Sequence, residues 1–317
     1  MNDLQNAIRQ EAARLLSENS VDVVIGFESA SVPLRPQPAF IKHAEDAEKL
    51  VYNGFCQNNL ATFLNRYPKQ TRVGLVARGC ESRAAYALMV EHQRSREHLV
   101  LIGVPCEGIL DWRKVELTAG ENILSAEETD GKVKVSSRLG EFEFERAELL
   151  HDSCARCVHP NPVNADIILG EAMPEGDPAL ARKPIEEFEA LNAAERYAYF
   201  THEAERCIRC YACREACPMC YCAECFVDHT TPRWAESTIA PSGTHAWHLV
   251  RAFHQTGRCV SCGACERACP MDIKMTYLTD KLNEDMRSLY GFEVGQDENS
   301  QPPFAAFSLD DKDRFVS

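Results

Sequence analysis

One cysteine spacing, CxxCxxCxxxCP, occurs twice in the last third of the chain and restricts what that region can fold into. The first copy contains Cys207, Cys210, Cys213 and Cys217, and the second contains Cys259, Cys262, Cys265 and Cys269. Each copy ends on a proline, and about 40 residues separate the two copies. Eight thiols at these steps are typical of the ligands of two 4Fe–4S clusters.

The spacing also predicts which cysteines share a cluster. Three thiolates at steps of three residues lie on one tight loop and hold three corners of a cube, whereas the fourth reaches the other cube. The predicted first cluster is held by Cys207, Cys210, Cys213 and Cys269, and the second by Cys259, Cys262, Cys265 and Cys217. Structural zinc is the alternative, but zinc sites use two CxxC pairs and no third cysteine three residues on.

The charge and composition of the chain disfavour several classes of function. The 317 residues include 48 acidic and 34 basic side chains, a formal net charge of −14, which argues against nucleic acid and anionic membranes as partners. The longest apolar runs, 21–27 and 99–105, have strand length, so no membrane span is predicted. The N-terminus lacks the features of a signal peptide, and 16 cysteines in that context predict metal binding in a reducing cytoplasm.

The first half of the chain has the pattern of an α/β domain. A strand, a helix and a second strand follow one another within about 30 residues, which predicts a βαβ unit with parallel strands. The predicted strands are 21–27, 72–77, 98–104 and 166–169, and the predicted helices are 3–18, 45–66 and 82–93. A polar hairpin, 132–135 with 142–144, is expected at the edge of this mostly parallel sheet.

The second half is predicted to be helical. Helices at 186–206 and 245–255 lead into the two cysteine runs, and a helix at 277–290 closes the region. This arrangement predicts an all-helical two-cluster ferredoxin, because the compact βαβ ferredoxin has a shorter interval between its runs. The predicted domains are an α/β domain over 1–175, the ferredoxin domain over 185–295 and a polar tail over 296–317.

A second set of cysteines lies in the α/β half. Cys80 and Cys106 each follow a predicted strand, and Cys154 and Cys157 form a CxxC pair shortly before the last strand. Because ligands gather beyond the carboxyl ends of parallel strands, these four thiols are expected to converge at one edge of the sheet. The residues alone leave three alternatives open: a third cluster, a zinc ion, or cysteines buried as small apolar side chains.

Residues of about 21–170 resemble the beta subunits of coenzyme-deazaflavin-reducing hydrogenases and formate dehydrogenases. The matching features are the PQP loop at 36–38, Gly79-Cys80, Pro105-Cys106, and the CARC motif at 154–157 followed by Ala165-Asp166. The resemblance implies that the four cysteines of the α/β half bind a 4Fe–4S cluster next to a FAD. From about 207 to 295 the chain resembles the cluster-carrying subunits of heterodisulfide reductase-like complexes.

The chain departs from that family where the flavin is expected. The family carries a Gly-Gly-x-x-Thr stretch in its first helix, whereas the first predicted helix here reads IRQEAARLLSEN and contains no glycine. No GxGxxG follows any predicted strand, although backbone must approach a pyrophosphate closely. FAD is therefore an open alternative, bound either by this chain or by a partner.

Two further groups of residues have open roles. Four cysteines lie outside the three sets and are either ligands of another cluster or zinc ion or free reduced thiols: Cys56, Cys220, Cys222 and Cys225. Five arginines flank the cysteine runs: Arg206, Arg209, Arg214, Arg258 and Arg267. These arginines either pair with surface acids or raise the reduction potential of a cluster.

The sequence predicts an iron–sulfur electron-transfer subunit of a multisubunit oxidoreductase of the hydrogenase, formate dehydrogenase or heterodisulfide reductase type. Such a subunit relays electrons between clusters and a flavin and has other redox subunits as partners. No nucleophile, paired general base or phosphate loop stands out, so no catalytic residue is assigned. The alternatives are a catalytic subunit whose own FAD reduces a deazaflavin or a nicotinamide, and an assembly protein whose clusters are structural.

Overall fold

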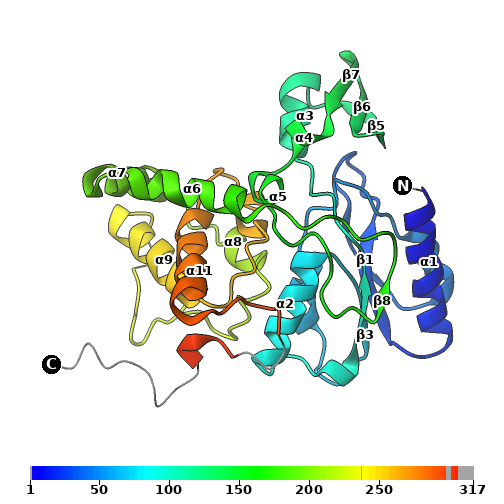
Figure 1. Cartoon of the computed structure of the whole chain (residues 1–317), viewed down its shortest axis with the longest axis horizontal. Coiled ribbons are helices and arrows are strands. Elements are labelled where there is room, and N and C mark those ends of the chain that lie inside the picture. Colours follow the sequence, from blue (N-terminus) through cyan, green and yellow to red (C-terminus); the bar gives the residue numbers. More distant parts are fainter. Residues whose placement is uncertain (1, 237, 298–300, 306–317) are drawn as a thin grey trace.

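The computed structural model describes residues 2–236, 238–297 and 301–305 (Figure 1). Most of the predicted tail, 296–317, lies outside these ranges. In the part that is described, no helix is both long and apolar enough to cross a lipid bilayer.

A five-stranded sheet organises the first half of the chain, in the order β2-β1-β3-β4-β8. Its strands are β1 (Val23–Glu28), β2 (Gln37–Ile41), β3 (Val73–Ala77), β4 (Leu99–Gly103) and β8 (Ile167–Ile168). Strands β1, β3, β4 and β8 run parallel, and β2 pairs antiparallel with β1 at the edge. The predicted mostly parallel sheet is confirmed, since continuous apolar strands such as VGLVA can be buried on both faces.

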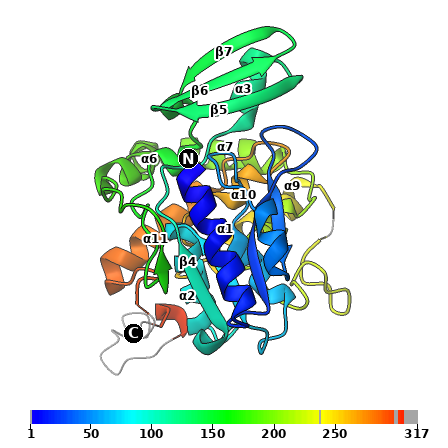
Figure 2. The same cartoon turned by 90° about the vertical axis from the view of Figure 1, so that its right-hand side faces the viewer.

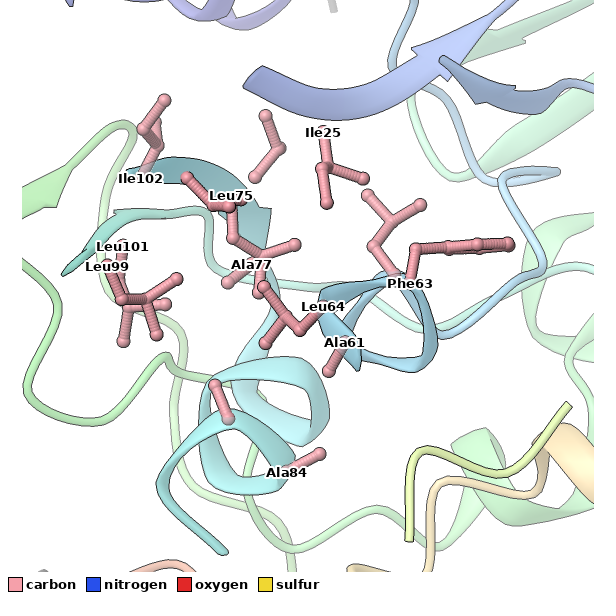
Figure 3. Packing of buried hydrophobic residues seen from close by; sticks show 14 of the residues in the cluster. Ile25, Ala61, Phe63, Leu64, Leu75, Ala77, Ala84, Leu99, Leu101 and Ile102 are labelled. Carbon is pink, nitrogen blue, oxygen red and sulfur yellow. The ribbon is translucent and has the colours of Figure 1, made fainter. Parts of the chain in front are cut away.

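Helices α1 (Asn2–Ser17) and α2 (Gly79–Val90) lie on opposite sides of this sheet (Figure 1). The core between the sheet, α2 and the segment before β3 is built of interlocking aliphatic side chains, including Ile25, Leu64, Leu75 and Leu101 (Figure 3). These four side chains have no solvent exposure. The core therefore fixes the positions at which β3 and β4 end. It thereby also fixes the positions of Cys80 and Cys106, which follow these strands.

The predicted continuous helix 45–66 is wrong. The structure has two short 3₁₀ segments, η1 (Ala44–Lys49) and η2 (Leu60–Arg66), joined by irregular backbone. Leu50 forms a β-bridge with Glu28, and the buried Arg78 guanidinium donates to the carbonyls of Cys56 and Asn58. These bonds from distant residues satisfy the backbone without a helix.

The predicted edge hairpin is instead part of a separate sheet, which is a second correction. Strands β5 (Ile123–Thr129), β6 (Lys132–Ser137) and β7 (Gly140–Glu145) form an antiparallel sheet that stands apart from the rest of the chain (Figure 2). Its inner face packs on α3 (Trp112–Ala119) and α4 (Arg146–Leu149). The fully buried Val133, Val135 and Val115 form this small core, so the strands have no need of the main sheet.

The second half is helical, as predicted. Two short helices, α8 (Ala212–Glu215) and α10 (Ala264–Arg267), lie within the cysteine runs; α5 (Asp152–Ala155) contains Cys154. The longer helices are α6 (Pro178–Ala190), α7 (Ala193–Glu205), α9 (Pro241–His254) and α11 (Thr276–Tyr290), and η3 (Arg96–His98) and η4 (Pro303–Ala305) are 3₁₀ turns. The predicted helix 186–206 is divided because Asn192 caps α7 in a reciprocal box with Glu195.

The two halves are joined by specific polar contacts. Arg267 donates to the carbonyl of Gln57 at 2.9 Å, and Arg83 donates to the carbonyl of Val294 at 2.9 Å. Arg258 pairs with Glu91 at 2.6 Å. These contacts bring the carboxyl edge of the sheet against the second cysteine run. We propose that the α/β domain extends over 1–175 and the ferredoxin domain over 185–295, the ranges predicted from the sequence.

Candidate iron–sulfur sites

The first predicted cluster set converges around a small cavity of about 20 Å³. Its four members line that cavity: Cys207, Cys210, Cys213 and Cys269. Burial raises the pKa of the Cys213 thiol, and the negative charges of the other three raise it further. Cys213 and Cys269 are buried, whereas Cys210 is exposed. This set therefore reaches the protein surface.

The second predicted set brings Cys217 to the other run. Burial raises the pKa of Cys259 to about 12, and the charges of Cys217 and Cys262 contribute to this shift. The charge of Cys217 also acts on Cys265. The structure thus places Cys217, the fourth cysteine of the first run, near the second run, as the spacing predicts.

The two runs share one local backbone geometry. Arg209 donates its backbone N–H to the sulfur of Cys207, and Ser261 donates equivalently to Cys259, both at 3.4 Å. Both donors have positive φ, 54° and 53°, and the N-cap residues of α8 and α10, Tyr211 and Gly263, are left-handed as well. Alternation of handedness aims N–H groups inward, which suits an anionic occupant.

The α/β set lines a larger cavity of about 240 Å³, together with Cys262 of the second run. The four predicted cysteines, Cys80, Cys106, Cys154 and Cys157, all contribute to its wall. Cys80 lies in the first turn of α2 and Cys106 in the loop after β4. Gly108 donates its backbone N–H to the sulfur of Cys106 at 3.3 Å, as in the two runs. The predicted convergence at the sheet edge is therefore observed.

Close contacts between backbone segments form part of the wall of this cavity. A Cβ on Gly79 would lie 2.7 Å from the carbonyl oxygen of Asn161 and still closer to that of His159. The backbone N–H of Cys106 donates to the carbonyl of Pro160 at 3.0 Å. The loop that follows Cys157 is thus pressed against the turns that carry Cys80 and Cys106.

We expect Gly79→Ala to open this cavity. Backbone oxygens cannot move aside as a flexible side chain can, so overpacking should destabilise the fold by about 1–3 kcal/mol. The measurement is anaerobic thermal melting with iron analysis. Gly74→Ala is the control, because its Cβ would meet only methyl groups of Val24 and Val21, the nearest at 3.2 Å. Equal melting temperature and iron content in the two variants would contradict the expectation.

The three sets lie next to one another. The charges of Cys262 and Cys106 both act on Cys80, so the α/β set adjoins the second set. A Cβ on Gly263 would overlap the side chain of Ser153, the residue before Cys154. The first and second sets meet at the buried Arg251, whose neighbours include Cys213 and Cys265.

Cysteines outside the sets have different surroundings. Cys56 is fully buried in the main core, and burial raises its pKa to about 12. Cys220, Cys222 and Cys225 line a cavity of about 340 Å³ together with Cys217, and Cys56 does not line it. Cys56 is therefore not part of the wall that the other three cysteines share. No three His, Cys, Asp or Glu side chains within the described ranges converge tightly enough for a single metal ion.

The flanking arginines fall into two groups. Arg206, Arg214 and Arg258 pair with Glu203, Asp228 and Glu91 at 2.6–2.8 Å. Arg209 contacts Tyr211, and Arg267 donates to the backbone carbonyl of Cys262 at 2.6 Å. The sequence left surface pairing and charge compensation equally open, whereas the structure assigns pairing to the first group.

Two buried side chains point to an anionic occupant. The Nε of Arg251 and one terminal nitrogen of Arg267 are buried and have no hydrogen-bond partner. Both lie beside the cysteine runs, and unpartnered buried donors are rare in folded proteins. Thiolate-ligated iron–sulfur clusters carry negative charge and accept N–H bonds at sulfur, so the residues fit such clusters. Sequence reasoning missed Arg251, because a single arginine in an amphipathic helix gives no signal.

Paired cysteine runs on short helices, with backbone N–H groups aimed at the sulfurs, define an iron–sulfur protein of the electron-transfer class. Residues 203–273 match the model of the 4Fe-4S dicluster domain. The chain is similar to the F420-dependent formate dehydrogenase subunit beta of Methanocaldococcus jannaschii, with 24% identity over 91% of each chain. It is also similar to the F420-dependent formate dehydrogenase 1 subunit beta of Methanococcus maripaludis, with 23% identity over 91% of this chain and 90% of the relative.

Among solved structures, the chain matches one from the F420-reducing [NiFe] hydrogenase complex of Methanosarcina barkeri. The match covers 50% of this chain and 63% of the other, with 16% identity and a TM-score of 0.39. The two formate dehydrogenase subunits span nearly the whole chain, and they confirm the resemblance drawn from the cysteine motifs.

Proposed function

We propose that the chain is the iron–sulfur electron-transfer subunit of a multisubunit oxidoreductase of the formate dehydrogenase or hydrogenase type. The observation that carries the proposal is the adjacency of three four-cysteine sets within one chain. Chains of closely spaced clusters are suited to moving single electrons, and the relatives are named as subunits of formate dehydrogenases.

The proposed ligands follow the three sets. Cluster I is held by Cys207, Cys210, Cys213 and Cys269, and cluster II by Cys259, Cys262, Cys265 and Cys217. Cluster III is held by Cys80, Cys106, Cys154 and Cys157. A 4Fe–4S cluster supplies one-electron transfer without making or breaking a bond to substrate. The residues of the chain exclude water, donate N–H groups to sulfur and hold the ligand sets at fixed separations.

The exposure of the ligands suggests the route. Cys210 of cluster I is exposed, and the neighbouring Ile208 and Met271 are apolar side chains exposed to 50% and 37%. The members of cluster II are half-buried and adjoin both other sets, so cluster II would be an internal relay. Electrons would exchange with a partner at cluster I and pass through cluster II to cluster III, or in reverse. A cytoplasmic location belongs to the same proposal.

The partner surface at cluster I gives a prediction. Ile208→Glu should reduce co-purification of the chain with its redox partner subunits, because a charge would be buried at the electron-exchange surface. The measurement is anaerobic affinity purification from the native host, with the partner identified by its metal or flavin content. Leu117→Glu is the matched control, since Leu117 is an exposed apolar residue on α3. A monomer that converts a small substrate unaided would contradict the proposal.

A catalytic subunit with its own FAD is the second candidate. An open cleft of about 1070 Å³ lies between the PQP loop and the small sheet, and its wall includes Arg35, Pro36 and Arg146. Glu107, next to Cys106, lines both this cleft and the cavity of cluster III. A flavin placed there would adjoin cluster III. Acid extraction of the purified chain separates the candidates: equimolar FAD favours this one, and flavin found only on a partner favours the first.

A further inference from the structure

Arg251 is a buried cation with few partners. It lies on α9 and is 5% exposed. One terminal nitrogen donates to the carbonyl of Cys213 at 3.4 Å, the other faces the sulfur of Met275 at 3.8 Å, and Nε has no partner. Within the described residues no carboxylate lies within ion-pair distance of this guanidinium.

Two other buried arginines have carboxylate partners. Arg78 pairs with Glu81 at 2.8 Å, and Arg83 lies 3.3 Å from Glu293. Arg94 also has a buried Nε without a partner, but its terminal nitrogens donate to three backbone carbonyls, those of Tyr67, Pro68 and Thr71. A buried charge without a counter-charge is strongly destabilising. Arg251 therefore needs an anion that the protein side chains do not supply.

The surroundings of Arg251 identify that anion. Arg251 donates to the backbone carbonyl of Cys213, and the negatively charged groups that act on its guanidinium include Cys265 and Cys217. Cys213 belongs to the proposed cluster I, whereas Cys265 and Cys217 belong to cluster II. Arg251 also lines the cavity that contains Cys217 and Cys220. The guanidinium thus lies between the two ligand sets.

We propose that Arg251 is the shared counter-charge of clusters I and II, donating N–H bonds to cluster sulfur and raising both reduction potentials together. The inference rests on the proposed function. Reduction adds one electron to a cluster and makes it more negative, so a fixed positive charge and an N–H donor favour the reduced form. Arg251 keeps its proton throughout, and no bond forms or breaks. Because one side chain acts on both clusters, it shifts their two potentials in the same direction.

The test is an EPR-monitored redox titration of the full chain, purified without oxygen. Arg251→Met should lower the potentials of clusters I and II by at least about 59 mV, which corresponds to a tenfold change in a one-electron reduction constant. Arg251→Lys keeps the charge but loses the planar donors, so its shift should be smaller. The potential of cluster III should stay unchanged. Arg94→Met is the control, since it also removes a buried arginine but lies at the opposite end of the strands.

Each result bears on the inference. Loss of iron from Arg251→Met with retention in Arg251→Lys supports it, because the charge is then needed to hold the clusters. Unchanged potentials in Arg251→Met, a shift at cluster III alone, or loss of iron from both Arg251 variants would overturn it. Wild-type protein without reversible cluster signals would overturn the proposed function as well, and this result is distinct from a variant that titrates like the wild type.

Discussion

Replacing Cys154 and Cys157 together by serine should lower the iron content from about 12 to about 8 atoms per chain, as expected for the loss of one 4Fe–4S cluster. Both thiols line the cavity shared with Cys80 and Cys106. Burial raises the pKa of Cys157 to about 11, and the charges of Cys154 and Cys106 add to this, so the thiols face a common space. Two remaining ligands would not retain a cube.

Anaerobic iron and sulfide analysis of the full chain measures this effect. Cys56→Ala is the matched control, because Cys56 is the cysteine buried in the main core and belongs to none of the three sets. Its iron content should equal that of the wild type. About 8 irons in the wild type, with no loss in the double variant, would reject cluster III. More than about 12 would implicate the cavity of Cys220, Cys222 and Cys225.

Cys217→Ser should remove the EPR signal of cluster II and leave that of cluster I in place. Cys217 follows the first run in sequence, but its charge acts on Cys259, Cys262 and Cys265 of the second run. A hydroxyl replaces a thiolate poorly at iron, so the cluster should be lost or strongly altered. The measurement is low-temperature EPR of the reduced protein.

Cys220→Ser is the matched control for this variant. Gln255 contacts both cysteines, since its amide donates to the sulfur of Cys220 at 3.4 Å and accepts from Cys217 at 3.6 Å. The two substitutions therefore disturb the same surroundings, but only one removes a proposed ligand. Loss of the cluster I signal in Cys217→Ser, or loss of cluster II in Cys220→Ser alone, would contradict the assignment.

The local sequence pattern predicts an element correctly where that element alone determines how its side chains are buried. The sequence predicts the strands β1, β3 and β4 because each is a continuous apolar run. In an α/β domain such a run fits a strand that is buried on both faces of the sheet. The predicted helix 45–66 is wrong because the side chains of its two 3₁₀ turns, η1 and η2, follow a spacing that resembles that of a single helix. Arg78, distant in sequence, holds the backbone between them irregular.

The small sheet shows a second limit. Alternation in β6 predicts a strand with one buried face, but it does not say which core that face meets. Val133 and Val135 pack against Val115 of α3 rather than against the main sheet. The choice depends on the path of the chain between β4 and β8, which no local pattern encodes.

The sequence by itself determined the chemistry, because the spacing of cysteines decides which thiols share a loop and which kind of cluster they suit. Only the tertiary structure decided how the sets are related. It places Cys80 beside Cys262, closes the α/β cavity through the backbone contacts of Gly79, and puts Arg251 between the two runs. These relations join segments that are far apart in sequence. They depend on helix packing and burial. A charge needs a counter-charge only once the fold has removed it from water, so the sequence alone does not show which arginine needs one.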